Sequence, residues 1–521
     1  NTNLGNILYD LDRHSEAIPC FRRALENTPD FSIIYKLAYS LRVMGNNDEA
    51  VTFCQQALLI EPESVATLIN MGAACNSQGR IEDAVACYRR AITVDPDYEG
   101  TYCALLMTLQ YYFKVSSEEL YAEARNFALK FEVPLRKVEN LATQMPQPGT
   151  RLRVGLVSAD LHNHPVGYFL EGVLRHLNSD SLALVAYANQ TVHDSLSERI
   201  RPFFEEWVTV AGLTDEQLAD RIKSDKIDLL IDLSGHSNGN RLLTFARRPA
   251  TVQATWLGYA STSGLESMDF ILADPLTIPP EEEQFYSEKV WRLPETYLCF
   301  TPPDLDLPIS SLPVLENGHI TFGCFNNPAK INNPAKINDT VITCWADILQ
   351  NVPESVLLLK YRNFDHEAEQ EACRQRFQRR GIAADRLRFA GASSRDEYLA
   401  AYREVDFCLD PFPFPGLTTT CEALWMGVPT LTLKMSRGMY GHNGELVMKM
   451  VGLNDWVAES IEEYLELART FAANFGWLAA LRTSLRETLL SSPLCDAGRF
   501  AGHLEQAFHG IARMHAASQT T

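Results

Sequence analysis

The first hundred residues repeat one hydrophobic pattern three times. The aligned segments are EAIPCFRRALENTPD (16–30), EAVTFCQQALLIEPE (49–63) and DAVACYRRAITVDPD (83–97), at steps of 33 and 34 residues. The positions that recur are Ala17, Ala50 and Ala84; Ala24, Ala57 and Ala91; Pro29, Pro62 and Pro96; and, upstream, Gly5, Ala38 and Gly72. Small residues where two helices touch, with proline ending the second helix, are typical of the tetratricopeptide repeat. Such arrays present a concave face to peptides, although a purely structural spacer is the alternative.

After residue 150 the pattern changes to short apolar runs that alternate with helical stretches. A first series of predicted strands covers 152–158, 183–188, 228–233 and 252–256. A second series covers 319–325, 355–361, 386–391, 406–410 and 429–433. Alternating strands and helices predict parallel sheets covered by helices. The Pro-rich segment 301–313 separates the two series, so we expect two doubly wound domains with a ligand at the carboxyl ends of their strands.

These patterns divide the chain into an α-solenoid followed by an α/β region. The predicted parts are tetratricopeptide repeats at 1–135, a linker at 136–150, an N-terminal Rossmann-like lobe at 151–313, a C-terminal nucleotide-binding lobe at 314–455 and C-terminal helices at 456–521. Because the sequence begins at Asn1 without Met, the true N-terminus stays open.

Charge and composition exclude several classes of protein. A net charge of −20 over 521 residues opposes nucleic-acid binding, which needs clustered Lys and Arg. No apolar run approaches the roughly 18 residues of a membrane span. The twelve cysteines lack metal-type spacing and are expected to be free thiols in a reducing compartment, so we expect a cytoplasmic protein.

Motif searches exclude the common phosphate and metal sites. The sequence contains no G-x-G-x-x-G, P-loop or H-E-x-x-H motif. D-x-D occurs at 10–12, 95–97 and 304–306, but none of these follows a core strand. We therefore predict no metal site.

The segment DFCLDPFPFPGLTTTCEALWMGVPTLTL (406–433) carries the strongest chemical signal. After a buried strand and a Pro-rich turn, Gly416 allows close approach of a ligand to the backbone. Hydroxyl and N–H groups then cluster at a predicted helix start, at Thr418, Thr419 and Thr420. A helix N-terminus binds anions without net positive charge, and Glu422 is placed to bind a ribose diol. The alternative is an ordinary capped helix.

This segment resembles the nucleotide-binding region of the protein O-N-acetylglucosaminyltransferase family, which includes the Spindly-type protein O-fucosyltransferases. The resemblance extends over nearly the whole chain, through the repeats, RVGLVSADLHNHPVGYFL (153–170), 228–274, FGCFNN and SSPL (491–494). It implies the GT-B architecture of two Rossmann-like lobes. It also implies inverting transfer of N-acetylglucosamine from UDP-GlcNAc to protein Ser or Thr, with no metal or other cofactor and with the acceptor polypeptide held by the repeat groove.

Matching motifs carry the family's functional positions onto this chain. His164 in "NHP" matches a histidine facing the sugar and the acceptor, and an imidazole suits proton transfer. The predicted nucleotide-sugar contacts are Gly258, Asn327, Arg395, Tyr398, Gly416, Thr418, Thr419, Thr420 and Glu422. For Tyr398 the resemblance and its aromatic ring predict stacking on the base, and an ordinary helix-face aromatic is the alternative. Leu417 replaces a histidine of the animal enzymes.

A duplicated hexapeptide leaves the position of the diphosphate lysine open. FNNPAKINNPAKIND (325–339) contains NNPAKI twice, with Lys330 and Lys336 at equivalent places. The family spacing from Phe325 selects Lys330, whereas the spacing to Trp345 selects Lys336. We favour Lys330 slightly, because strand ends set the ligand cleft in this fold.

Two other functions fit the same residues. One is protein O-fucosylation from GDP-fucose, which the similarity of the threonine segment to Spindly-type sequences favours. The other is a repeat-based adaptor whose transferase lobes no longer turn over, which the presence of His164, the threonines and a lysine opposes.

Overall fold

The computed structural model describes residues 2–26, 30–135, 151–325 and 336–518. The chain forms two compact units that each combine distant segments. The first unit contains Asn1–Lys114, Pro313–Phe414 and Ala468–Ala473, and the second contains Val115–Leu312, Pro415–Leu467 and Asn474–Thr521. The predicted linker 136–150 lies outside the described residues.

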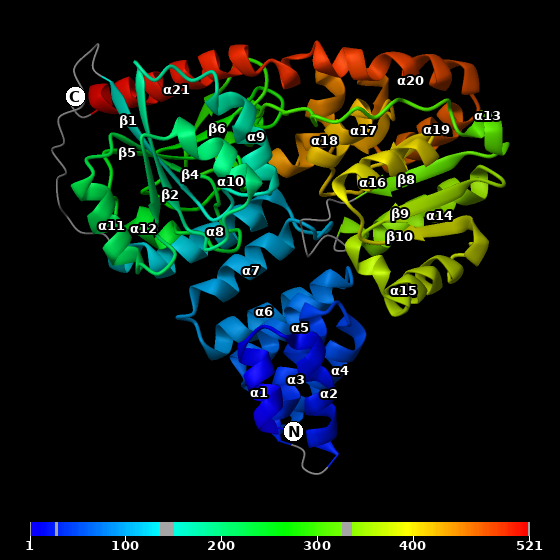
Figure 1. Cartoon of the computed structure of the whole chain (residues 1–521), viewed down its shortest axis with the longest axis horizontal. Helices are drawn as coiled ribbons and strands as arrows, with labels where there is room; N and C mark the ends of the chain where they lie inside the picture. Colours follow the sequence, from blue (N-terminus) through cyan, green and yellow to red (C-terminus); the bar gives the residue numbers. More distant parts are fainter. Residues whose placement is uncertain (1, 27–29, 136–150, 326–335, 519–521) are drawn as a thin grey trace. The chain divides into compact units, whose positions relative to one another are not determined.

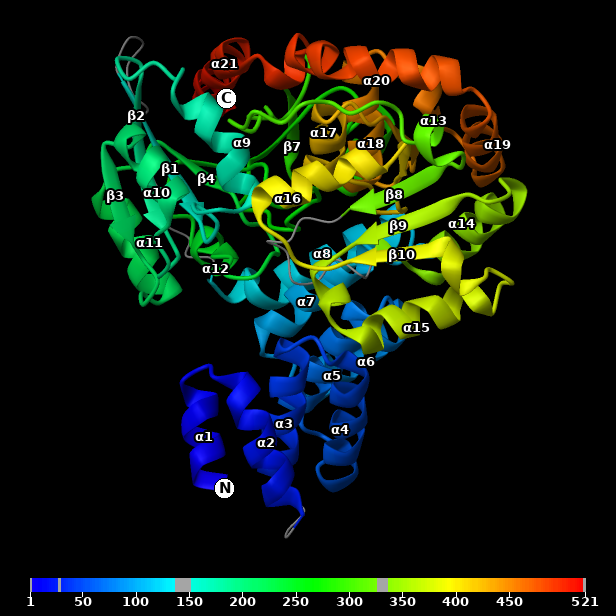
Figure 2. The same ribbon diagram turned by 45° about the vertical axis from the view of Figure 1, so that its right-hand side comes forward.

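The repeats are antiparallel helix pairs, drawn in blue in Figures 1 and 2. Their helices are α1 (Thr2–Asp10), α2 (His14–Leu25), α3 (Phe31–Val43), α4 (Asn47–Ile60), α5 (Val65–Ser77), α6 (Ile81–Val94) and α7 (Glu99–Leu109). The recurrent alanines are buried, as the repeat alignment predicts.

The recurrent small residue of each first helix has a packing reason. A Cβ added to Gly5 would lie 2.7 Å from the ring of Phe21, and one added to Gly72 would lie 2.9 Å from the ring of Tyr88. The second repeat has Ala38 instead of glycine, and there the residue aligned with Phe21 and Tyr88 is the smaller Cys54. The volumes therefore compensate across the helix pair.

The first sheet belongs to the second unit and contains seven parallel strands in the order β3-β2-β1-β4-β5-β6-β7. The strands are β1 (Leu152–Ser158), β2 (Leu182–Ala188), β3 (Glu206–Thr209), β4 (Leu229–Asp232), β5 (Val252–Thr255), β6 (Phe270–Ala273) and β7 (Lys289–Arg292). The sequence predicted four of them and missed β3, β6 and β7. The two edge strands, β3 and β7, are half-exposed and carry charged residues, so they lack the continuous apolar run of a central strand.

Helices flank this sheet in the ribbon views. They are α8 (Ser117–Phe131), α9 (Pro165–Leu174), α10 (Ser195–Ile200), α11 (Asp215–Ser224) and α12 (Leu242–Ala246). Helix α8 is tied to this unit, because the carboxylate of Glu132 accepts the backbone N–H groups of Glu266 and Ser267.

The second series of strands begins in the first unit. Parallel pairing gives the order β10-β9-β8-β11, with β8 (Thr321–Phe325), β9 (Val356–Lys360), β10 (Leu387–Ala390) and β11 (Phe407–Leu409). Its helices are α13 (Val314–Asn317), α14 (Asp339–Asn351), α15 (Glu367–Gln378) and α16 (Arg395–Ala400). The carboxylate of Asp406, directly before β11, accepts the backbone N–H groups of Val314 and Thr321. It thereby links the start of β11 to the start of α13 and of β8.

The remaining strands pair with each other in the second unit, β12 (Thr430–Leu433) with β13 (Val457–Ala458) in parallel. The helices from here onward are α17 (Thr418–Trp425), α18 (Met439–Met450), α19 (Ile461–Ala472), α20 (Phe475–Leu490) and α21 (Ala497–Ser518). The predicted repeats and the two Rossmann-like sheets are present, whereas the predicted domain bounds stay a prediction.

All twelve cysteines are free thiols, as expected, and ten of them are buried. In the part of the chain that the structure describes, no helix is long and apolar enough to cross a membrane.

Candidate active site

His164 begins helix α9, directly after strand β1 and its loop. Its Nδ1 accepts the backbone N–H of Val166 at 3.4 Å, so the residue is the N-cap of α9. Pro165 occupies the first helical position, where its missing N–H is not needed. The side chain is 18% exposed, which leaves part of the imidazole accessible to a ligand.

Acidic residues surround the two histidines of this loop. Asp160 lies 3.6 Å from Nδ1 of His164 and 3.8 Å from Nε2 of His162. Asp194 lies 4.0 Å from Nδ1 of His162 and accepts the N–H groups of Asn163, Leu196 and Ser197. Burial alone would raise the pKa of Asp194, but these N–H groups and His162 lower it overall, so its carboxylate is ionised.

The two partners of His164 Nδ1 favour different proton positions. A ring that accepts the Val166 N–H on Nδ1 carries its proton on Nε2 when it is neutral. A proton shared with Asp160 instead leaves Nε2 as the acceptor that a general base needs. A role for this ring as a general base requires the tautomer that faces Asp160, and that role stays a prediction.

Position 258 requires glycine for a structural reason that does not depend on a ligand. A Cβ at this position would lie 1.8 Å from the carbonyl oxygen of Leu233, at the carboxyl end of β4. The preceding Leu257 has φ of 73°, a left-handed conformation that is costly for a leucine. Only glycine fits at position 258, which brings the 256–260 loop onto the end of the sheet.

Helix α17 begins after Leu417, whose side chain accepts no hydrogen bond. Leu417 is therefore not an ordinary side-chain N-cap, and an anion at this helix end stays a prediction. Thr418 and Thr420 are buried and Thr419 is half-buried, so Thr419 is the most exposed of the three residues.

Glu422 lies in the same helix but is completely buried. A ribose would reach its carboxylate only if the side chain became accessible, so the ribose contact stays a prediction. The second unit thus holds His164, Gly258, Gly416, Thr418, Thr419, Thr420 and Glu422.

The predicted residues of the first unit are Lys336, Arg395 and Tyr398. Lys336 is 7% exposed, and its Nζ lies 4.3 Å from the ring centroid of Phe414. Lys330 and Asn327 lie outside the described residues. The structure therefore supplies geometry for the second lysine of the duplicated hexapeptide and none for the first.

Tyr398 is 1% exposed and has aromatic and cationic neighbours. Phe325 and Tyr402 meet its ring edge-on, at centroid distances of 6.0 and 5.9 Å. The cations of Arg395 and Lys360 lie 5.8 and 6.0 Å from its centroid. Stacking of this ring on a nucleotide base stays a prediction, and it requires a movement that exposes the ring.

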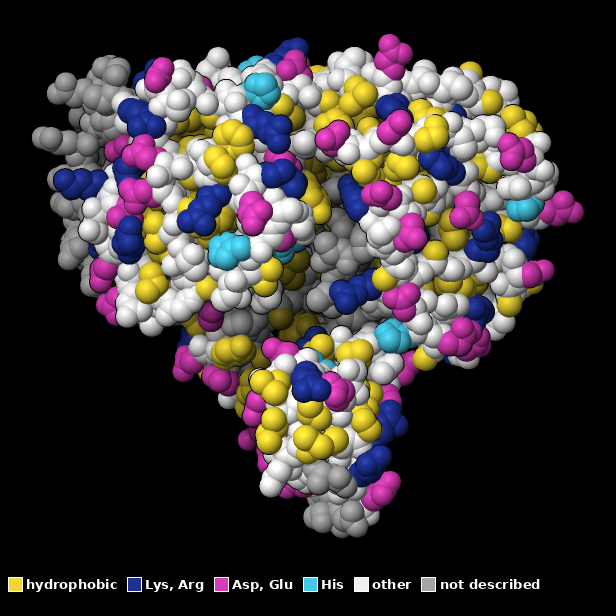
Figure 3. All heavy atoms as spheres, viewed as in Figure 1, with side chains coloured by type: hydrophobic (Ala, Val, Ile, Leu, Met, Phe, Trp, Pro, Cys, Tyr) yellow, Lys and Arg dark blue, Asp and Glu magenta, His cyan; other side chains and the backbone are white. Residues whose placement is uncertain are grey.

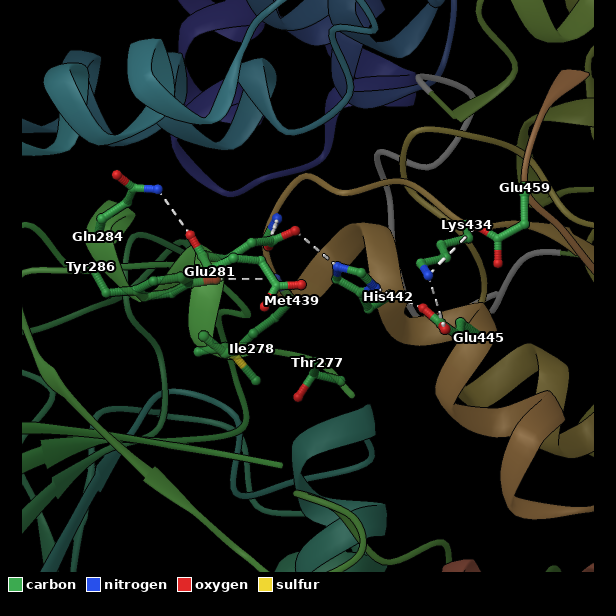
Figure 4. A network of polar contacts seen from close by, with 12 residues as sticks. Thr277, Ile278, Glu281, Gln284, Tyr286, Lys434, Met439, His442, Glu445 and Glu459 are labelled. Carbon is green, nitrogen blue, oxygen red and sulfur yellow. Dashed lines mark hydrogen bonds and ion pairs between the residues drawn. The ribbon is translucent and has the colours of Figure 1, made fainter. Parts of the chain in front are cut away.

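The sequence did not single out a buried polar network around His442 on α18 (Figure 4). Its Nδ1 lies 2.7 Å from Glu445, and its Nε2 lies 3.1 Å from Glu282 in the 3₁₀ helix Pro280–Phe285. Glu282 also accepts the N–H of Gly438 at the start of α18. The i,i+3 spacing of His442 and Glu445 was the available signal, but the partner Glu282 is distant in sequence.

Charge stabilises this network. Burial by itself lowers the pKa of His442, but Glu282 and Glu445 outweigh burial and raise it to about 9. Burial likewise opposes ionisation of Glu445, but His442 and Lys449 lower its pKa to about 2. The imidazolium therefore joins the 3₁₀ helix at 280–285 to α18 within one unit.

Among residues 2–26, 30–135, 151–325 and 336–518, no group of three or more His, Cys, Asp or Glu side chains is arranged to hold a metal ion.

The two parallel sheets, the repeats and the helix α17 after a strand define a repeat-bearing protein of the two-lobed glycosyltransferase class. Comparison with known families agrees: the profile of glycosyl transferase family 41 matches residues 128–301 and 314–504. Tetratricopeptide-repeat profiles match 1–31, 31–64 and 65–98. The chain belongs to glycosyl transferase family 41.

Similar proteins come from plants, animals and bacteria. The "Probable UDP-N-acetylglucosamine--peptide N-acetylglucosaminyltransferase SPINDLY" of Petunia hybrida is 34% identical over 81% of this chain and 45% of its own length. The UDP-N-acetylglucosamine--peptide N-acetylglucosaminyltransferase of Caenorhabditis elegans is 24% identical over 69% of this chain and 40% of its own. A solved mutant of Thermobaculum terrenum O-GlcNAc transferase superposes with a TM-score of 0.89 at 30% identity, over 99% of both chains. This chain thus spans about half the length of the curated relatives that it matches.

Proposed function

We propose that this protein is an inverting, metal-independent glycosyltransferase that moves N-acetylglucosamine from UDP-GlcNAc to Ser or Thr hydroxyls of proteins. The observation that carries the proposal is the N-terminus of α17, where Leu417 supplies no side-chain cap and three threonines follow, inside the stretch that matches the family profile. The N–H groups at such a helix end stabilise a diphosphate without positively charged side chains, which is compatible with the net charge of −20 of this chain.

The reaction requires stabilisation of a departing nucleoside diphosphate. The N–H groups and hydroxyls at Thr418–Thr420 bind its phosphate oxygens, and a lysine of the duplicated hexapeptide neutralises the remaining charge. His164 accepts the proton of the acceptor hydroxyl as the new glycosidic bond forms at the anomeric carbon. The acceptor oxygen attacks from the side opposite to the leaving group, and this inverts the configuration of that carbon.

The acceptor is a protein segment held by the repeats. Tetratricopeptide arrays bind extended peptides on their concave face. In the space-filling view, hydrophobic side chains gather over the repeats (Figure 3). Leu4 and Ile7 in α1, and Leu11 directly after it, are each more than half exposed. The repeats therefore offer apolar as well as polar surface to a partner.

The second candidate is protein O-fucosylation from GDP-fucose. The identity of 34% with a SPINDLY protein, against 24% with the Caenorhabditis elegans transferase, favours this donor through the Spindly branch of the family. The Thermobaculum terrenum O-GlcNAc transferase, at 30% identity and nearly full coverage, favours UDP-GlcNAc.

A thermal-shift panel of UDP, GDP, UDP-GlcNAc and GDP-fucose separates the donors. We expect stabilisation by UDP and UDP-GlcNAc, and release of UDP when a protein extract is added with UDP-GlcNAc. If only GDP and GDP-fucose stabilised the protein, the donor would be GDP-fucose and not UDP-GlcNAc. Nucleotide binding with neither transfer nor hydrolysis would indicate the adaptor instead.

A further inference from the structure

The segment that follows the last repeat helix contacts the Pro-rich turn of the nucleotide lobe within the first unit. The ring of Tyr111 stacks on the ring of Phe414 at a centroid distance of 4.8 Å and an interplanar angle of 25°. Phe113 meets Phe412 edge-on at 6.0 Å. Two aromatic pairs therefore join residues 111–113 to residues 412–414.

The segment that leads into α14 contacts the same turn. Lys336 places its Nζ 4.3 Å from the ring centroid of Phe414. Asn338, the N-cap of α14, donates from Nδ2 to the carbonyl oxygen of Phe412 at 2.7 Å. The turn at 412–414 is thus in contact with both the end of the repeats and the lysine segment.

Burial makes this arrangement more than a surface contact. Tyr111 and Lys336 are each 7% exposed, and Phe414 between them is half-buried. A cation over an aromatic face is stabilised by the ring quadrupole, and more so when water is excluded. The stack therefore limits the positions open to the ammonium group without neutralising it.

We propose that Tyr111 is a positioning residue that holds Lys336 through Phe414, so that the end of the repeat array sets where the diphosphate-binding ammonium lies. The inference rests on the proposed function in one respect, the role of Lys336 at the diphosphate. The order of contact is Tyr111, Phe414, Lys336. An acceptor that shifts the last repeat helix also shifts the ammonium group of Lys336 through this stack. Acceptor binding by the repeats is thereby linked to stabilisation of the leaving group.

The neighbouring Tyr112 supplies a matched control. Its hydroxyl donates to Glu82 on α6, at 3.2 Å, so it contacts a repeat helix. Tyr112→Leu removes the same side-chain volume one residue away from Tyr111→Leu. Tyr111→Phe keeps the stacked ring and loses only the hydroxyl.

The first test does not depend on any donor. Trace acetylation of the full chain with acetic anhydride, read by mass spectrometry, compares Lys336 with the exposed Lys289 of β7. Tyr111→Leu should raise the relative reactivity of Lys336 by about tenfold, whereas Tyr111→Phe and Tyr112→Leu should leave it within about twofold of the wild type. Unchanged reactivity in Tyr111→Leu, or an equal rise in Tyr112→Leu, would overturn the proposal.

The second test measures UDP-GlcNAc hydrolysis without an acceptor. Tyr111→Leu should lower kcat about tenfold with KM within about twofold, and Tyr111→Phe should restore it. A general loss of folded protein would reduce activity in Tyr112→Leu as well and would contradict a positioning role. If the wild type turns over no donor, the proposed function fails, while the acetylation comparison still decides whether Tyr111 holds Lys336.

Discussion

The carboxylate of Asp160 lies 3.6 Å from Nδ1 of His164, four residues further along the chain. The sequence drew attention to the histidine and not to the aspartate. Their proximity gives the ring the orienting partner that general bases use to fix their tautomer. His164 directly precedes α9, whose first residue is Pro165, so its backbone position is fixed by the start of that helix whichever tautomer the ring adopts.

We expect His164→Ala to reduce transfer by about a hundredfold while nucleotide affinity changes less than about twofold. Asp160→Asn should reduce kcat/KM by about tenfold, because the imidazolium that forms in proton transfer loses an anionic partner. The measurement is the rate of transfer beside nucleotide titration by calorimetry. Wild-type turnover by His164→Ala would remove this residue from the mechanism.

Thr419→Val tests the anion site at α17. Loss of the hydroxyl should raise the Kd for UDP by about tenfold, because a phosphate oxygen loses a hydrogen bond. Thr419→Ser keeps the hydroxyl and should bind as the wild type does. Equal affinity of the valine and serine variants would count against a phosphate at this helix end.

The duplicated hexapeptide calls for paired substitutions. The sequence favours Lys330 slightly, and Lys330 lies outside the described residues. Lys336 is buried two residues before the N-cap of α14, and the inference from Tyr111 assigns the diphosphate to it. Lys336→Ala should therefore reduce UDP-GlcNAc hydrolysis by at least about a hundredfold, with a smaller effect from Lys330→Ala. The opposite order, measured as kcat for both variants, would assign the diphosphate to the first copy.

His442→Gln should lower the free energy of unfolding by about 3 kcal/mol at pH 6, because a buried ion pair loses its cation. The pKa of His442 is about 9 in the folded protein, above its ordinary 6.5. Its contribution is therefore fully present below about pH 6.5 and is lost as the pH rises through about 9. Chemical denaturation at pH 6 and pH 10 should show a difference between variant and wild type that shrinks at the higher pH. A constant difference would mean that His442 stabilises only by packing.

Local patterns predicted most of the fold. Small residues at fixed spacing predicted the repeats, and apolar runs predicted nine strands. Both patterns are local, because each is contained in one helix pair or one strand. β3, β6, β7 and β13 were missed. Of these, the edge strands β3 and β7 are half-exposed, and β13 has only two residues, too few to form a pattern. The resemblance to the protein O-N-acetylglucosaminyltransferase family was confirmed by the match to glycosyl transferase family 41 and by the similar proteins.

The sequence by itself determined which chemical groups the protein has: a histidine before a helix, threonines at a helix start and a lysine beside a strand end. Tertiary structure alone decided their surroundings. It placed Asp160 at His164, made Leu417 the N-cap of α17 and buried Tyr398 and Glu422. It also joined Tyr111 to Lys336 through Phe414, across more than two hundred residues. Contacts between residues far apart in the chain depend on packing of whole elements, and no local periodicity encodes them.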